Sequence, residues 1–113
     1  MAYNEYLADR VRQRMSSLDS IEEKKMMGGL IFMANEKMCV GVGEEKESKE
    51  DQLMVRIGKL AYEDLLGQRG STLMDFTGKP MRGFLFISQE GFDSEDDLDF
   101  WVEKALEFNQ LIK

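Results

Sequence analysis

The sequence predicts a two-layer α+β domain in which helices cover one face of a mainly antiparallel five-stranded sheet. Three observations predict it: an amphipathic segment at each end of the chain, short apolar runs bounded by turn residues, and links of hairpin length between most runs. Such short links favour antiparallel pairing, because a parallel pair needs a long crossover. The expected order is helix, three strands, helix, two strands, helix, and residues 1–113 form a single domain.

The helices are predicted from apolar spacing and from their ends. Apolar residues recur every four positions from Tyr3 to Met15, so they share one face of a helix that runs to about Ser17. A short helix is expected over 59–66. The last helix begins after Ser94, which precedes three acids and is expected to cap the first turn. Its apolar stripe is expected in the core: Leu98, Trp101, Val102, Ala105, Leu106 and Ile112.

The strands are predicted at the apolar runs 30–34, 37–42, 53–57, 73–76 and 82–88. Alternation within the second run places Met38, Val40 and Val42 on one face and Cys39 with Gly41 on the other. The segment 24–29 ends in the paired glycines Gly28 and Gly29, which allow a turn or a close backbone approach. The charged stretch 43–52 is expected to be a solvated, mobile loop.

The composition argues against several kinds of site. The chain has no histidine and one cysteine, which removes histidine-dependent nucleophile systems and the usual zinc sites. No glycine-rich phosphate loop is present. We therefore predict no catalytic residue, no metal and no cofactor, and expect Cys39 to be structural. The single cysteine, the missing secretion signal and the absence of a long apolar run indicate a cytoplasmic protein.

The net charge of −7 bears on the partner. Nucleic-acid binding draws much of its affinity from phosphate neutralisation, which an acidic chain opposes. The sequence therefore predicts a protein-interaction module, with a homodimer as one expected form. The alternatives are a direct nucleic-acid-binding regulator, a small-ligand-binding protein and an enzyme that uses carboxylates or lysine. The uncovered face of the predicted sheet is where we expect a dimer or partner surface.

Two basic sets are candidate partner-binding residues. Lys24 and Lys25 are expected either to form a patch with the three arginines of the first helix or to be solvated beside Glu22 and Glu23. The second set is Arg56, Lys79 and Arg82, which fall on or beside strands. These three would hold an anion or an acidic peptide if their strands are neighbours, or would each pair with a local carboxylate.

Five stretches together resemble the N-terminal domain of the TfoX (Sxy) family. They are EEKKMMGGLIFM at 22–33, KMCVGV at 37–42, LMVRIG at 53–58, DFTGKPMRG at 75–83 and LDFWV at 98–102. The resemblance implies a fold like the secretion-chaperone α+β class. It also implies a link to natural competence, in which full-length members resemble coactivators of a cyclic-AMP receptor-type regulator. Those members carry a second, helical domain that this sequence lacks, so the expectation is a stand-alone version.

Overall fold

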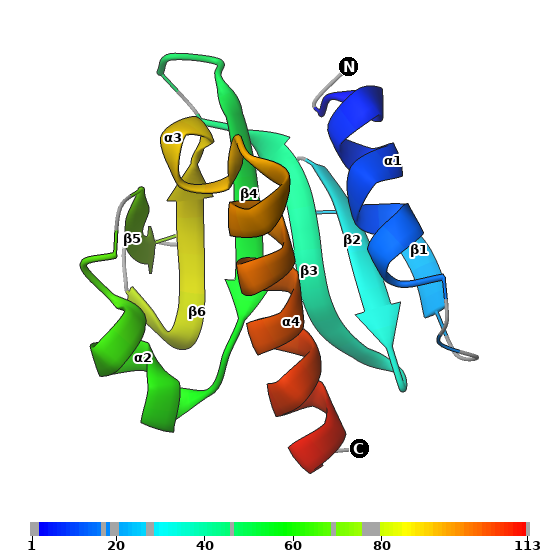
Figure 1. Cartoon of the computed structure of the whole chain (residues 1–113), viewed down its shortest axis with the longest axis vertical. Coiled ribbons are helices and arrows are strands. Elements are labelled where there is room, and N and C mark those ends of the chain that lie inside the picture. The colour runs from blue at the N-terminus through cyan, green and yellow to red at the C-terminus, as the bar shows by residue number, and fades with distance from the viewer. Residues whose placement is uncertain are drawn as a thin grey trace.

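The computed structural model describes residues 3–16, 18, 21–26, 29–45, 47–68, 70–75 and 80–112, and for residues 73–75 and 80–82 it describes the backbone. The helices of this part are α1 (Glu5–Arg14), α2 (Lys59–Leu65), α3 (Gln89–Phe92) and α4 (Glu95–Ile112). Its strands are β1 (Ile21–Met26), β2 (Gly29–Ala34), β3 (Lys37–Glu44), β4 (Asp51–Arg56), β5 (Ser71–Asp75) and β6 (Pro80–Ser88). They form one antiparallel sheet in the order β1-β2-β3-β4-β6-β5 (Figure 1). The predicted fold class is confirmed.

Strand β1 was not predicted, so the sheet has six strands in place of five. The sequence predicted no strand before the paired glycines, but Lys24 to Met26 lie in β1, and Gly29 begins β2. Gly28 lies outside the described residues. β1 pairs along its whole length with β2, while most of its side chains are exposed. A charged, exposed strand is typical of a sheet edge, where one side of the ladder has no neighbour. Its polarity is why an apolar pattern did not reveal it.

A β-bulge in β3 overturns the predicted faces of that strand. Phe32 pairs with Val40 but Met33 pairs with Met38, which leaves Cys39 as an extra residue. Cys39 and Val40 therefore both lie in the core under the helices, whereas Met38 lies on the opposite face. The expectation that Met38 shares a face with Val40 and Val42 is wrong, because the bulge shifts the alternation by one residue.

The predicted hairpin between β2 and β3 is confirmed, and the loop between β3 and β4 is shorter than predicted. Asn35 and Glu36 both have positive φ, 52° and 65°, as the two-residue turn of a twisted hairpin requires. β3 and β4 run into the charged stretch expected to be a loop, because Gly43 pairs with Gln52 and Glu44 with Asp51. Of that stretch, only the residues between Glu44 and Asp51 lie outside the strands.

All four described helices send their buried side chains into one core on the same face of the sheet. Leu7 and Val11 come from α1, Tyr62 from α2, and Leu98 from α4, and they meet strand residues such as Phe32. Trp101 is buried as predicted, and its Nε1 donates to the carbonyl of Gly91 at 3.0 Å. The expectation that the helices cover one face is confirmed.

The long helix α4 is fixed at its start and near its end. Ser94 Oγ accepts a hydrogen bond from the N–H of Asp97 at 3.1 Å, which confirms the predicted cap. Near the other end, the buried Asn109 donates to the carbonyl of Ala34 at 2.9 Å and accepts from Asn35 at 2.8 Å. α4 is thereby tied to the β2–β3 turn. Within the described residues, no helix is long and apolar enough to span a membrane.

Candidate functional site

The face of the sheet turned away from the helices carries a second apolar cluster, made of strand residues alone. We call it the sheet-face cluster: Ile31, Met33, Met38, Met54, Phe84 and Phe86. Gly41 lies between Ile31 and Met54, and a side chain there would collide with the Cδ1 of Ile31 at 2.7 Å. Ile31 and Met54 thus close over the glycine and are buried, while the other four side chains of the cluster are half-buried. The result is a continuous apolar surface over β2, β3, β4 and β6.

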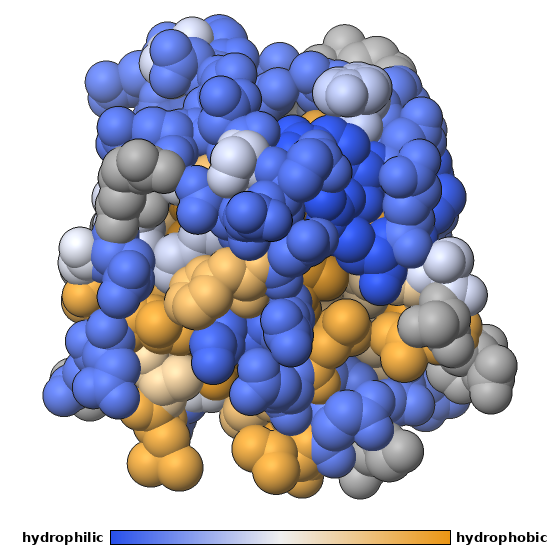
Figure 2. Space-filling view, viewed as in Figure 1, coloured by the Kyte–Doolittle hydropathy of each residue, from blue (hydrophilic) through white to orange (hydrophobic). Residues whose placement is uncertain are grey.

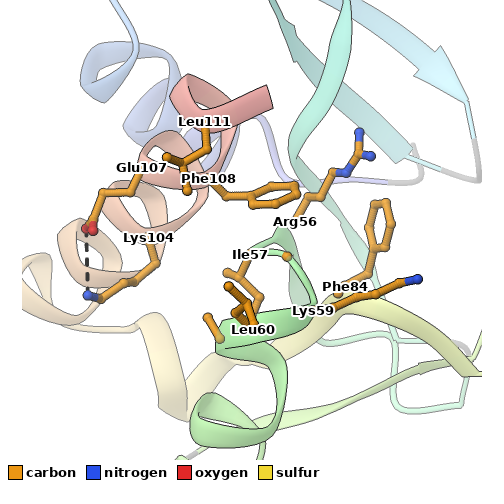
Figure 3. Close-up of a pocket in the computed structure, with 12 residues that line it drawn as sticks. Arg56, Ile57, Lys59, Leu60, Phe84, Lys104, Glu107, Phe108 and Leu111 are labelled. Atoms are coloured by element: carbon orange, nitrogen blue, oxygen red, sulfur yellow. Dashed lines mark ion pairs between the residues drawn. The ribbon is translucent and has the colours of Figure 1, made fainter. Parts of the chain in front are cut away.

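A groove of about 500 Å³ opens at the end of the sheet where β4 leads into α2 (Figure 3). Its apolar walls come from β4, β6, α2 and the last turns of α4: Ile57, Leu60, Phe84, Phe108 and Leu111. Phe84 also belongs to the sheet-face cluster, so the groove and that cluster are continuous around the end of the sheet.

Two glycines shape the floor of the groove. Gly58 has φ +85° and ψ 161°, a region that only glycine adopts readily. A Cβ at Gly58 would lie 2.4 Å from two ring carbons of Phe108. The carbonyl of Gly83 accepts hydrogen bonds from the N–H groups of Ile57 and Gly58 at 2.8 and 3.1 Å. The chain therefore turns closely beneath the Phe108 ring and leaves that ring as a groove wall.

Arg56 passes between two aromatic rings at the mouth of the groove (Figure 3). Its guanidinium carbon lies 5.3 Å from the centroid of Phe84 and 5.6 Å from that of Phe108. Cation–π contacts at these distances hold the side chain in place. Among the ion pairs between described side chains, none includes Arg56. Its charge is therefore oriented but not neutralised by a described carboxylate.

Two lysines add to the positive charge around the groove. Lys59 is exposed at the first turn of α2. Lys104 on α4 forms an ion pair with Glu107 at 3.6 Å, which Figure 3 marks by a dashed line. The lining thus holds three cations and one carboxylate, in a chain whose net charge is −7. The groove lining is therefore net positive, whereas the whole chain is net negative.

Figure 2 shows how the two ends of the helix side differ: hydrophilic residues fill its upper part, and hydrophobic residues gather toward the lower end. Two large apolar residues of the groove lining are highly exposed, Leu60 and Leu111, with 97% and 81% of their surface accessible. Leucines this exposed are costly to hydrate and, next to an apolar groove, enlarge the apolar patch. The groove therefore continues onto an exposed rim.

The arginines of α1 join the helices to one another and to β1. Arg10 and Arg14 both bind Glu95, at 2.8 and 2.5 Å, and Arg14 also binds Asp99. Arg12 binds Glu23 of β1 at 2.6 Å and also pairs with Asp9. The hydrogen bond from Arg12 lowers the pKa of Glu23 below its usual range, and that from Arg14 does the same to the pKa of Glu95. These arginines contact carboxylates of the same chain, which argues against a basic patch.

The predicted residues Lys24 and Lys25 are exposed on β1 but point to opposite sides of the sheet. Lys24 pairs with Ile31 of the sheet-face cluster, and Lys25 pairs with Leu30 of the core face. The strands β2 and β3 separate them from Arg56 on β4. The structure therefore does not bring these lysines together with Arg56.

The predicted shared site of Arg56, Lys79 and Arg82 depended on their strands being neighbours. The strand of Arg56, β4, does pair with β6. Arg56 pairs directly with Phe84, two residues beyond Arg82 in β6. The side chain of Arg82 and the whole of Lys79 lie outside the described residues. Of this set, the structure places Arg56 at a site.

The sequence patterns did not predict that five of the groove residues lie at a site: Lys59, Leu60, Lys104, Phe108 and Leu111. One signal was present: Phe108 and Leu111 are apolar residues of the last helix that the predicted core stripe left out. Nothing in the sequence showed that this end of α4 faces the start of α2.

Cys39 is buried in the core, as its predicted structural role requires. Burial raises the pKa of its thiol to about 12. Because the thiolate is the reactive form of cysteine, the neutral thiol has little reactivity at neutral pH.

Comparison with known proteins agrees with this architecture. Residues 13–109 match the family described as the TfoX N-terminal domain. The chain belongs to this family. The match extends over every strand of the TfoX N-terminal domain and over the groove residues Arg56, Lys59, Lys104 and Phe108. The resemblance drawn from the sequence motifs is thereby confirmed. No curated protein matches the chain.

Proposed function

We propose that this TfoX N-terminal domain is a non-catalytic protein-interaction module that acts in the cytoplasm as a transcription or competence-related regulator or adaptor. The observation that carries the proposal is the sheet-face cluster, which lies opposite all described helices. Apolar clusters that remain partly exposed on one face of a domain are typical of interaction sites. Methionine is well suited to such a surface, because its flexible thioether adapts to the shape of a partner.

The charges support a protein partner over nucleic acid. Arg10, Arg12 and Arg14 contact carboxylates of the same chain, and the net charge of −7 repels phosphates. A methionine-rich sheet face offers apolar contact instead. Because the face belongs to every copy of the chain, a homodimer formed through it would be symmetric.

The test is capture of partners from the host lysate by the tagged protein, with and without nuclease, followed by mass spectrometry. Two variants remove apolar atoms from the sheet-face cluster, Met33→Ser and Phe86→Ser. Tyr6→Ser is the matched control, since Tyr6 is an exposed aromatic residue on α1. We expect one protein to be retained after nuclease treatment, to be lost with both cluster variants and to be kept by the control.

Two results would contradict the proposal. Loss of all captured protein on nuclease treatment would indicate a nucleic-acid binder. Equal capture by wild type and both cluster variants, with circular dichroism showing that they are folded, would place the interaction elsewhere. Sedimentation equilibrium on the same proteins separates a homodimer from a complex with another chain, because a homodimer forms in the purified wild type.

A further inference from the structure

The groove at the end of the sheet combines three properties that together specify a ligand. It has an apolar wall at the Phe108 ring, an exposed apolar rim at Leu60 and Leu111, and a surplus of positive charge, since Arg56, Lys59 and Lys104 outnumber the one lining carboxylate, Glu107. An apolar groove alone says little about its occupant. The cations make this groove selective, because an acidic ligand gains attraction here that a basic ligand does not.

The rim indicates the size of the ligand. Leu60 is 97% exposed and Leu111 is 81% exposed, so both line the groove at its outer edge and keep most of their surface in water. A small molecule seated against Phe108 would leave these leucines in water. A peptide segment that crosses the groove would cover both, because they lie on α2 and α4, the two helices that border it. The exposed leucines therefore favour a segment of a protein as occupant.

Arg56 indicates which group of the ligand is recognised. Its guanidinium is held by Phe84 and Phe108 at 5.3 and 5.6 Å, so little freedom is lost when it binds. The planar guanidinium matches a carboxylate with two parallel hydrogen bonds. Lys59 and Lys104 are more mobile point charges that suit further carboxylates along the segment.

We propose that this groove binds an acidic segment of a partner protein in which at least one large apolar side chain lies close to aspartate or glutamate. The apolar side chain packs against Phe108 and the two rim leucines, and a neighbouring carboxylate binds Arg56. This inference rests on the proposed function, because the segment belongs to a protein partner. The binding surface in this inference is the groove, whereas the proposed function is argued from the sheet-face cluster.

The experiment begins with selection of random peptides on the immobilised wild-type protein. We expect the selected sequences to be enriched in aspartate and glutamate next to leucine, phenylalanine or tryptophan. The best of them, labelled with fluorescein, is then titrated with purified protein by fluorescence polarisation. Replacing its acids with lysine is expected to abolish binding, and added salt is expected to weaken it because exposed charges are screened.

Variants of the protein locate the peptide. Lys59→Glu and Lys104→Glu are each expected to weaken binding at least about threefold, the effect of losing one exposed ion pair. Leu60→Ser removes an apolar contact at a residue whose exposure keeps the fold unaffected. The matched controls are Lys25→Glu on β1 and Tyr6→Ser on α1, both exposed and on elements that do not line the groove. Both controls are expected to bind like wild type.

Failure of this inference is distinct from failure of the proposed function. Selection of no peptide, selection of basic peptides, or groove variants that bind as tightly as the controls would each overturn the inference. Self-association that is lost with Leu60→Ser would overturn it too, since the occupant would then be a second copy. Lysate capture that depends on Met33 and Phe86 would still stand in all these cases, because those residues do not line the groove.

Discussion

The sheet carries apolar side chains on both faces, but the described helices cover only one of them. Under the helices, Phe32, Leu85 and Ile87 are fully buried against side chains from α1 to α4. On the opposite face, Phe84 and Phe86 of the same strand β6 remain half-buried, and the surrounding cluster consists of strand residues alone. The covered face accounts for the stability of the fold, because burial of apolar surface is its main driving force. The other face is a surface that the fold itself does not require.

Adjacent residues of β6 give the largest expected contrast between the two faces. Leu85→Ala empties a fully buried position and is expected to lower the free energy of unfolding by about 3 kcal/mol. Phe86→Ala removes a larger side chain but is expected to cost about 1 kcal/mol, since that ring already contacts water. Urea unfolding followed by circular dichroism measures both. Equal losses would show that the sheet face is covered within the monomer.

In the groove, adding a single methyl group at Gly58 is expected to lower the free energy of unfolding strongly. Gly58→Ala combines a backbone conformation that only glycine adopts readily with a Cβ 2.4 Å from the Phe108 ring. We expect it to lower the free energy of unfolding by about 2–3 kcal/mol. Gly67→Ala is the control: its φ is +108°, but a Cβ there meets nothing within 4 Å. It is expected to cost about 1–2 kcal/mol from strain alone. If thermal unfolding shows that Gly58→Ala and Gly67→Ala lower the free energy of unfolding equally, the Phe108 ring does not pack closely against Gly58.

The smallest effect is expected on the covered side, where Arg12 of α1 binds Glu23 of β1 at 2.6 Å. Glu23→Gln is expected to lower the free energy of unfolding by about 0.5 kcal/mol at neutral pH, the size typical of a partly exposed ion pair. Because the pKa of Glu23 is lowered in the folded protein, its contribution is present above the pKa of the unfolded state. The contribution disappears as the pH falls through the lowered pKa of the folded state.

Melting temperatures of wild type and Glu23→Gln, measured from neutral to acidic pH, check this sign. We expect the difference between the two proteins to shrink as the solution becomes acidic. A difference that grows toward acidic pH would mean that Glu23 is held in its protonated form and that the ion pair does not act in solution.

Most elements of the fold were predictable because their signals are local. The apolar period of α4 and its cap at Ser94 were read from the sequence and are confirmed. Strand β1 was missed because its side chains are charged, and only its backbone pairing with β2 makes it a strand. The faces of β3 were misassigned because the extra residue at Cys39 is defined by pairing with β2 and leaves no mark on composition.

The candidate site was less predictable than the fold. Arg56 was predicted as a candidate partner-binding residue, and the structure places it at the mouth of the groove. Its companions there, Lys59, Lys104 and Phe108, were not identified, because two of them lie on α4, some fifty positions further along the chain. Lys24 and Lys25 were grouped by their adjacency, yet adjacent residues of a strand point to opposite faces.

The sequence by itself determined the fold class, the family, the acidic charge and the absence of histidine, because these depend on composition, local periodicity and ordered motifs. Only the tertiary structure decided which apolar residues are covered by helices and which basic side chains come together at the groove. The strand order puts β4 beside β6, and the packing of α4 on the sheet brings Phe108 over Gly58 and beside Arg56. Contacts between residues this far apart depend on the packing of whole elements, which no local pattern records.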